Sequence, residues 1–334
     1  MILRTPHTMA AAPLFAMLLL RASATPYPNV CAAGSPWNTT ACAAGWSCCP
    51  NAYSPSGWGC APFPNAVCCP DNFSACPAGT VCVRSAPPAP PSWNTSVGYN
   101  CSTPGGEVAR ALPSCKGGPP LPPDGARKNV VYIGDSLSEG LQPVVAAALA
   151  DVALVQHAPW GGGGGAGTAA LAAQCAVPYF LRSPSGIPVA PDVVLFNSGM
   201  HNTCPGTVTP GKCDHPSAYL ADLESLTAQL LAWAGGSGAR LVFALTTLYE
   251  CDATVNGFIQ QMNRDAQAVM ARHGIAVLNG TYEAILEKCG PPPHPGCASE
   301  PSWGDTCFCP HCGPAYAWLA AQALVPQLRA FLGA

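Results

Sequence analysis

The sequence predicts an α/β fold, a parallel sheet with helices on both faces, preceded by a small disulfide-rich domain. Two observations lead to this prediction. Short apolar runs bounded by turn residues alternate with helical patterns in the second part of the 334-residue chain, whereas 11 of the 20 cysteines crowd into residues 31–115. Strands that alternate with helices are typical of a parallel sheet covered by helices. A cysteine-rich segment with few apolar residues must be held together by crosslinks.

The first 24 residues are typical of a secretory signal peptide. Arg4 supplies a positive charge, an apolar run follows it, and residues 22–24 form a small-residue cleavage site. The apolar run is shorter than the roughly 20 residues that cross a bilayer. No later stretch of the sequence reaches that length without Gly, Pro or polar residues. We therefore expect a secreted chain with no membrane anchor after the signal is removed.

The charge of the chain argues against polyanionic partners. Charged residues make up 9% of the sequence and the net charge is -3, whereas nucleic acids and anionic membranes attract basic surfaces. We therefore expect no nucleic-acid partner. Five N-x-S/T sequons fit a glycoprotein of the secretory pathway, and they begin at Asn38, Asn72, Asn94, Asn100 and Asn279.

Residues 31–101 resemble the granulin/epithelin repeats. The pairs Cys48-Cys49 and Cys68-Cys69 alternate with short turns, and a granulin would have two further pairs, where this chain has Ala61 and Ala75. In a granulin those two absent cysteines bond to each other, so their joint loss leaves no unpaired thiol. Another small cystine-rich fold, of a carbohydrate-binding kind, is the alternative. The resemblance implies five disulfides: Cys31–Cys48, Cys42–Cys60, Cys49–Cys68, Cys69–Cys82 and Cys76–Cys101.

Residues 102–127 are rich in proline and glycine, which is typical of a stiff linker. We therefore place the second domain at residues 128–334. Eleven cysteines precede this boundary and nine follow it, so either one disulfide joins the two modules or two thiols stay free. Within the second domain, Cys204–Cys213 and Cys289–Cys297 could each close a loop.

The second domain has the strands and helices of a parallel sheet. Buried strands are predicted within residues 129–136, 191–199, 239–248 and 273–280, where short apolar runs end in turns. Helical stripes of apolar residues lie between them, and we interpret these stripes as core faces. One consists of Leu220, Leu223, Leu226 and Leu230; the other consists of Ile259, Met262, Ala266, Val269 and Met270, and Gly274 ends it.

The first of these strands ends in Gly134-Asp135-Ser136-Leu137, followed by a helical stretch. Ligand sites of parallel sheets form at the carboxyl ends of strands. The motif in this position resembles that of the GDSL, or SGNH, hydrolases, and the resemblance extends over roughly residues 128–332. It implies a three-layer sandwich with Ser136 as a nucleophile. A helix that begins at Ser136 would point backbone N–H groups at an anion formed there.

The other blocks of this family follow in order along the chain. The glycine whose N–H faces the oxyanion matches Gly165, or alternatively Gly164. In the third block, His201 stands where the family has the oxyanion asparagine, and Asn202 stands where it has aspartate. A shifted assignment would make Asn202 the donor.

The fourth block supplies His311 ahead of a C-terminal helix. The residue three before it is Phe308, where the family has an aspartate, and the nearest carboxylate is Asp305. Three further interpretations stay open at this segment. His311 could be a zinc ligand together with Cys307, Cys309 and Cys312, it could be inert, or the domain could be a non-catalytic partner of a binding or signalling module.

The residue types of these blocks suit ester hydrolysis. A serine hydroxyl attacks an acyl carbon once His311 takes its proton, and Asp305 would orient that histidine. The N–H groups of Ser136 and Gly165 and the ring of His201 would stabilise the oxyanion. The resemblance implies small acyl esters as substrates, acetylated polysaccharide being one candidate, with transfer to a sugar hydroxyl also open. We expect no cofactor and no metal.

Overall fold

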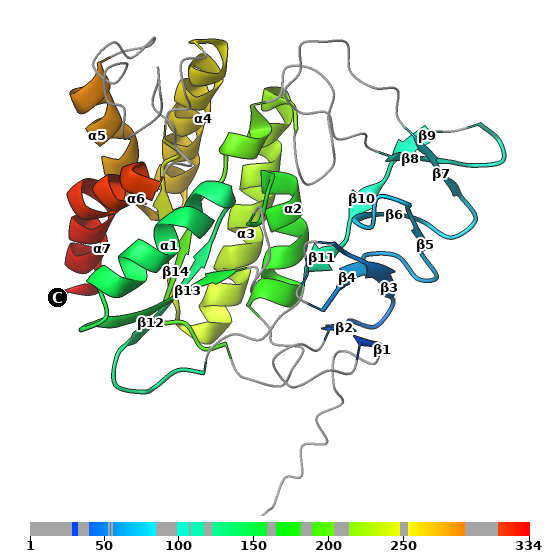
Figure 1. Cartoon of the computed structure of the whole chain (residues 1–334), viewed down its shortest axis with the longest axis horizontal. Helices are drawn as coiled ribbons and strands as arrows, with labels where there is room; N and C mark the ends of the chain where they lie inside the picture. Colours follow the sequence, from blue (N-terminus) through cyan, green and yellow to red (C-terminus); the bar gives the residue numbers. More distant parts are fainter. Residues whose placement is uncertain are drawn as a thin grey trace, which may run out of the picture.

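The computed structural model describes residues 29–32, 40–52, 54, 56–84, 99–106, 108–116, 122–158, 165–181, 189–203, 214–247, 253–290 and 313–334. These residues form a helix-covered sheet and, beside it, a smaller module of short strands (Figure 1). The expected signal peptide, residues 1–24, lies outside the described residues. No helix within the described part of the chain is both long and apolar enough to cross a membrane.

The larger part is built on a parallel sheet of five strands. The strand order is β13-β12-β14-β15-β16, and every neighbouring pair is parallel. The strands are β12 (Lys128–Ile133), β13 (Ala153–Ala158), β14 (Val193–Phe196), β15 (Arg240–Ala244) and β16 (Ala276–Leu278). Strands β12 and β14 are buried almost throughout, as expected of a sheet covered on both faces. The predicted α/β fold class is confirmed.

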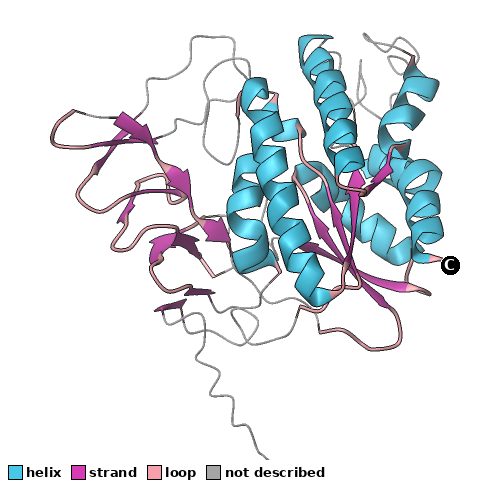
Figure 2. Ribbon diagram, turned by 180° about the vertical axis from the view of Figure 1, so that it is seen from behind, coloured by secondary structure: helices cyan, strands magenta, loops and turns pink. Residues whose placement is uncertain are grey.

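Helices cover both faces of this sheet (Figures 1 and 2). One layer consists of α2 (Ala169–Cys175), α3 (Tyr219–Ser237) and α4 (Ala253–Arg272). The other consists of α1 (Ser136–Ala148), α5 (Gly280–Cys289), α6 (Gly313–Leu319) and α7 (Val325–Leu332). Two π-helical segments, η1 (Ala176–Phe180) and η5 (Ala320–Leu324), extend α2 and join α6 to α7.

One predicted core residue was wrong. Leu220 is 44% exposed, whereas Leu223, Leu226 and Leu230 are buried. The buried stripe of α3 begins one residue earlier, at Tyr219, because the spacing i, i+4, i+7, i+11 keeps residues on one face of a helix. The stripe of α4 is buried as predicted, and Gly274 follows that helix with a φ of 65°.

The described residues of the small module form eleven short strands, which disulfides hold together. All five disulfides implied by the granulin resemblance are present. Two small buried clusters belong to this module alone, and cysteines make up much of them. The strands are β1 (Asn29–Ala32), β2 (Thr40–Cys42), β3 (Ser47–Pro50), β4 (Trp58–Ala61), β5 (Val67–Cys68), β6 (Ser74–Cys76), β7 (Val81–Arg84), β8 (Tyr99–Ser102), β9 (Val108–Arg110), β10 (Leu112–Pro113) and β11 (Cys115–Lys116).

Part of the expected linker is paired with the small module. Strands β9, β10 and β11 pair with β8, β6 and β4, respectively, all antiparallel. Short strands can add to exposed sheet edges through backbone hydrogen bonds even where the sequence is rich in proline and glycine. Residues 108–116 therefore continue the small module towards the larger one.

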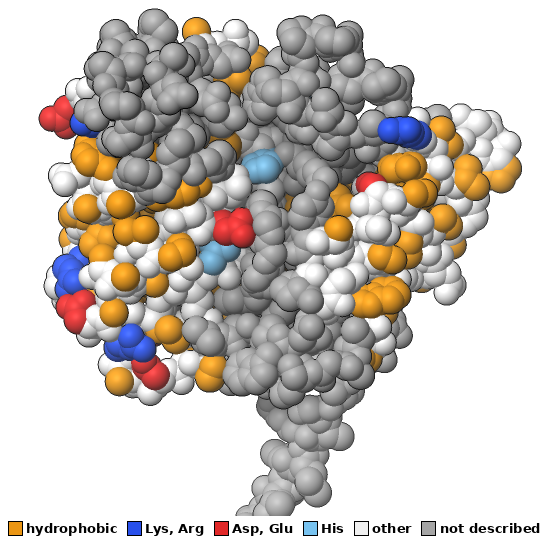
Figure 3. Space-filling model, viewed as in Figure 1, with side chains coloured by type: hydrophobic (Ala, Val, Ile, Leu, Met, Phe, Trp, Pro, Cys, Tyr) orange, Lys and Arg blue, Asp and Glu red, His pale blue; other side chains and the backbone are white. Residues whose placement is uncertain are grey.

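A sixth disulfide, Cys115–Cys175, joins the two parts of the chain. It is the bridge between modules that the uneven cysteine counts allow. The described residues contain no free cysteine. The predicted pairs Cys204–Cys213 and Cys289–Cys297 lie outside the described side chains. On the face drawn in Figure 3, charged side chains are few and scattered, in keeping with the low charge of the sequence.

Candidate active site

Ser136 lies at the carboxyl end of β12, as the first residue of α1. Asp135 caps this helix, and its side chain accepts a hydrogen bond from the N–H of Leu137 at 3.1 Å. Gly134, Asp135 and Leu137 are buried, whereas Ser136 is partly accessible. The hydroxyl of Ser136 is therefore presented to solvent by a turn that the buried neighbours hold in place.

Gly165 packs against this turn from the loop that follows β13. Its φ is 59°, a conformation that favours glycine. A Cβ at this position would fall on the backbone of Gly134 and Asp135, and the N–H of Ala166 donates to the carbonyl of Gly134 at 2.6 Å. Only glycine fits this contact. Gly164, the alternative, lies outside the described residues.

His201 approaches Ser136 from the carboxyl end of β14. It belongs to a 3₁₀ turn, Met200–Asn202, that follows Gly199. Gly199 has a φ of 146°, and a Cβ there would lie 2.8 Å from Oγ1 of Thr246. The Nε2 atom of His201 is 3.3 Å from Oγ of Ser136. Depending on its tautomer, this ring either donates a hydrogen bond towards the serine or accepts its proton.

Asn202 is bonded to the start of α2. It is fully buried, and its Oδ1 accepts a hydrogen bond from the N–H of Ala169, at the first residue of α2, at 3.1 Å. Its amide nitrogen is also buried and has no hydrogen-bond partner among the described residues. Asn202 therefore ties the turn that carries His201 to the start of α2.

His311 and Asp305 lie outside the described residues, as do Cys307, Cys309 and Cys312. The nearest described element is α6, which begins at Gly313. Tyr316 of α6 packs on Gly140 of α1 so closely that a Cβ on this glycine would fall on the tyrosine ring. Helix α6 is thereby in contact with α1, the helix that begins at Ser136.

Ser138 and His157 form a second serine–histidine pair, which the sequence analysis missed. Oγ of Ser138 lies 2.6 Å from the carbonyl of Asp135 and 2.7 Å from Nε2 of His157. Because the single hydroxyl proton goes to the carbonyl, His157 donates to Ser138. The pair supports the turn before Ser136. The sequence indicates this pair only through a histidine near the end of a strand. That β13 lies beside β12, and so brings His157 close to Ser138, is known only from the pairing of the sheet.

The tyrosines near the site stay protonated. Burial, with a smaller contribution from the Asp135 carboxylate, raises the pKa of Tyr132 and of Tyr219 far above the ordinary value. Burial, Asp135 and Glu139 together raise the pKa of Tyr316 to about 12. The hydroxyl of Tyr219 donates a hydrogen bond to the carbonyl of Ser198 at 3.0 Å.

Two groups of three sulfur atoms have the spacing of metal ligands. One contains Cys31, Cys42 and Cys48, and the other Cys69, Cys76 and Cys82. All six cysteines are in disulfides. A disulfide sulfur offers no thiolate to a metal, so neither group is a candidate metal centre.

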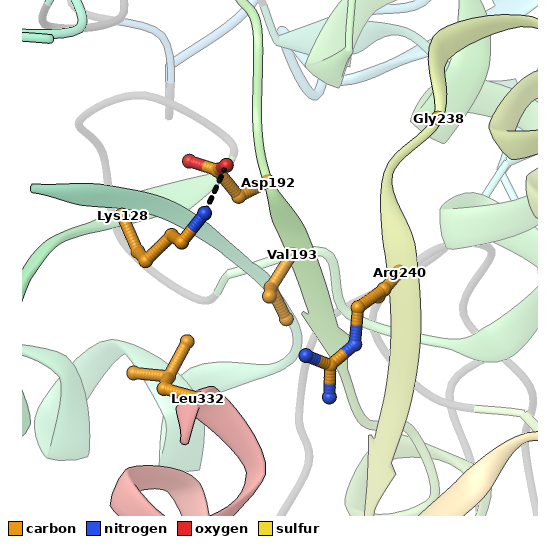
Figure 4. Close-up of a pocket in the computed structure, with 6 residues that line it drawn as sticks. All are labelled: Lys128, Asp192, Val193, Gly238, Arg240 and Leu332. Atoms are coloured by element: carbon orange, nitrogen blue, oxygen red, sulfur yellow. Dashed lines mark hydrogen bonds and ion pairs between the residues drawn. The ribbon is translucent and has the colours of Figure 1, made fainter. Parts of the chain in front are cut away.

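A pocket lies at the amino-terminal ends of the strands, whereas Ser136 lies at their carboxyl ends. Figure 4 shows the residues that line this pocket. Lys128, Val193 and Arg240 line it from the amino-terminal ends of β12, β14 and β15. Lys128 forms an ion pair with Asp192 at 3.1 Å. Burial alone would raise the pKa of Asp192, but the N–H of Asn129 and the Lys128 ammonium outweigh it and hold this pKa below the ordinary value. Residues at the amino-terminal ends of strands line this pocket, and none of its lining residues is a candidate catalytic residue.

The comparison with protein families supports the assignment of the small module. The family model described as Granulin matches residues 47–86, so the granulin resemblance is confirmed. No curated protein sequence matches the chain.

Solved structures similar to the chain include GDSL-type hydrolases. A GDSL-like lipase from Bacteroides thetaiotaomicron is 14% identical with a TM-score of 0.43, over 63% of this chain and 91% of the other. A lipase/acylhydrolase from Enterococcus faecalis is 16% identical with a TM-score of 0.42, over 61% and 96%. An acetylxylan esterase from Geobacillus stearothermophilus, solved as a catalytic mutant, is 13% identical with a TM-score of 0.43, over 62% and 94%.

Proposed function

We propose that the chain is a secreted serine esterase that hydrolyses small acyl esters. One observation carries the proposal: Ser136 begins a helix at the carboxyl end of a central strand, with His201 3.3 Å from its hydroxyl and Gly165 packed on its turn. A serine within hydrogen-bond reach of a histidine, beside backbone N–H groups, is the arrangement that acyl transfer requires.

In this proposal, His311 is the general base and Asp305 orients it. The support comes from the family motif and from chain order, since α6 begins two residues after His311 and packs on α1 one turn beyond Ser136. A neutral imidazole accepts the serine proton near pH 7. A carboxylate on the far ring nitrogen would fix the tautomer and stabilise the imidazolium.

The oxyanion donors would be the N–H groups of Ser136 and Gly165 and the ring N–H of His201. A neutral imidazole keeps one N–H and can therefore replace the amide of an asparagine. The contact between Nε2 and Ser136 supports this role for His201. The burial of Asn202 and its bond to Ala169 disfavour the shifted assignment, in which Asn202 would donate.

The reaction would proceed in two halves. Oγ of Ser136 attacks the acyl carbon as its proton passes to His311, and the carbonyl oxygen becomes an oxyanion held by the three donors. The intermediate collapses, the alcohol leaves with the proton from His311, and an acyl-serine remains. Water then gives a proton to His311 and attacks the acyl carbon, and a second oxyanion intermediate forms. This intermediate collapses to the free acid as Oγ of Ser136 leaves and takes the proton back from His311. A sugar hydroxyl in place of water would make the same site an acyltransferase.

The granulin-like module and the six disulfides of the described residues support folding in an oxidising, extracellular compartment. The GDSL resemblance supports acyl esters, and we propose O-acetyl groups of extracellular polysaccharide as the substrate class. The test measures acetate released from acetylated xylan and from p-nitrophenyl acetate, with p-nitrophenyl decanoate as the long-chain comparison. We expect turnover of the two acetyl esters and little of the decanoate. Turnover of neither acetyl ester would refute the proposal.

A further inference from the structure

The small module is attached to the larger domain at one helix. Cys175, the last residue of α2, is in a disulfide with Cys115 of β11. Its neighbour Gln174 donates a hydrogen bond from Nε2 to the carbonyl of Pro113 at 2.8 Å. Both cysteines are fully buried. The end of α2 is therefore fixed to the last two strands of the small module by a disulfide and by the hydrogen bonds of Gln174.

Tyr179 makes a second attachment, just beyond α2 in η1. Its side chain is fully buried, and its hydroxyl accepts a hydrogen bond from the N–H of Ala43 at 3.1 Å. The centroid of its ring lies 5.0 Å from that of Trp46. Ala41, Cys42, Cys60, Phe73 and Cys115 belong to the same buried cluster as the residues of the sheet. The small module thus shares the core of the larger domain.

The other end of α2 begins at the candidate oxyanion loop. Thr168 caps the helix through a hydrogen bond from the N–H of Leu171 to its Oγ1. Asn202, one residue after His201, accepts from the N–H of Ala169. Gly165 lies three residues before the cap and is bridged to Asp135. Two of the proposed donors, Gly165 and His201, are therefore tied to the start of α2.

We propose that the granulin-like module stabilises the oxyanion hole by holding α2 in place, and we call this role a brace. By fixing the end of α2 and η1, the module holds α2 in place along its axis. The start of α2 then fixes Gly165 directly and His201 through Asn202, a positioning residue. A helix transmits such a constraint because its backbone bonds make it stiff, and a misplacement of about 1 Å at a catalytic group costs on the order of a hundredfold in rate. The catalytic consequence rests on the proposed esterase function; the mechanical one does not.

The test compares full-length variants at and away from the contact. The contact variants are Cys115→Ser with Cys175→Ser, and Tyr179→Phe with Gln174→Ala, which keeps every disulfide should the first fail to fold. The control is Cys69→Ser with Cys82→Ser. It removes one disulfide of the same module, and these two cysteines pack in a buried cluster separate from the shared core.

Two readouts are measured for each variant. The first is kcat and KM for p-nitrophenyl acetate. The second is hydrogen exchange of the amides of Ala166, Ala169 and Leu171, which bond to Gly134, Asn202 and Thr168. We expect the contact variants to lose about tenfold or more in kcat with KM within about twofold, and to exchange these amides faster. The control should match the wild type in both readouts.

Equal kcat and equal exchange in contact variants and control would overturn the brace. If the wild type shows no turnover that depends on Ser136, the proposed function fails, and the exchange rates alone decide on the brace.

Asn202 offers an independent check. Asn202→Ala should lower kcat and leave KM nearly unchanged, and Asn202→Asp should recover most of the loss because a carboxylate also accepts from the Ala169 N–H at a helix start. An aspartate variant as slow as the alanine variant would overturn the positioning role.

Discussion

Three loops that are distant in sequence meet at the hydroxyl of Ser136. Gly165 and Gly199 make this possible, because each occupies a backbone conformation and a space that a side chain would not fit. The motif residues Gly134 to Leu137, Gly165 and His201 could be found from the sequence. His157 could not, and neither could the orientation of Asn202. The contact of His157 and the orientation of Asn202 depend on which strands and helices lie side by side. The order of the strands in the sheet decides this.

His201 provides the prediction at the residue scale. If it donates to the oxyanion, His201→Ala should lower kcat by about a hundred- to a thousandfold with a modest change in KM, the usual cost of one lost donor. His201→Asn should recover much of the loss, because an amide also donates. Steady-state kinetics with p-nitrophenyl acetate measures both. An asparagine variant as inactive as the alanine variant would instead make His201 the base.

At the scale of elements, apolar runs and turn residues were enough to predict four strands of the sheet. The first residue of the stripe on α3 was predicted one position too late, because Leu220 and Tyr219 are both large and apolar and only packing decides between them. The close approach of α6 to α1 could not be predicted, because Gly140 carries no signal until the ring of Tyr316 lies on it.

Gly140→Ala tests this helix contact. The new methyl group would displace Tyr316 and with it α6, so we expect a loss of about 1–3 kcal/mol in the free energy of unfolding and a lower kcat. Gly257→Ala in α4 is the matched control, because a Cβ there meets nothing within 4 Å. It should stabilise by about 0.5–1 kcal/mol through helix propensity. Chemical denaturation measures both. Equal effects of the two substitutions would contradict the contact.

The ion pair at the start of the strands gives a pH dependence. Because the pKa of Asp192 is lower in the folded chain than its ordinary value, its contribution to stability is present above about pH 4 and is lost as the pH falls through the lower, folded pKa. Asp192→Asn should therefore destabilise the chain at pH 7 and make little difference at pH 2. Thermal unfolding of both proteins at the two pH values measures this. A difference that stays constant down to pH 2 would contradict it.

At the scale of the whole molecule, the granulin resemblance was enough to predict five disulfides. For the sixth, the odd numbers of cysteines in the two modules allowed only the inference that a disulfide could join the modules. They did not say which two cysteines form it. Its partner Cys175 lies 60 residues from Cys115 in sequence, and the choice among the nine later cysteines depends on how β11 packs against α2. His311 as the candidate base stays a prediction from the sequence motif. Asp305 as its carboxylate stays a prediction from its place as the nearest acidic residue, because Phe308 stands where the motif has aspartate.

A cut between the modules tests the sixth disulfide. A specific protease site introduced between residues 117 and 121 would separate Cys115 from Cys175 in the chain. After cleavage and denaturation, we expect one band on a gel without reductant and two bands with it. The Cys115→Ser, Cys175→Ser variant, cut at the same site, should give two bands in both cases. Two bands from the parent protein without reductant would contradict the bridge.

The central claim is that Ser136 forms a covalent bond to the acyl group. The most direct measurement is the reaction of the protein with a fluorophosphonate, followed by mass spectrometry of the labelled peptide. Ser138, two residues on, is the internal control because it shares the peptide but is buried and bonded to Asp135 and His157. We expect one adduct per chain, on Ser136, and none in Ser136→Ala. An unlabelled wild-type protein, or a label that persists in Ser136→Ala, would contradict the claim.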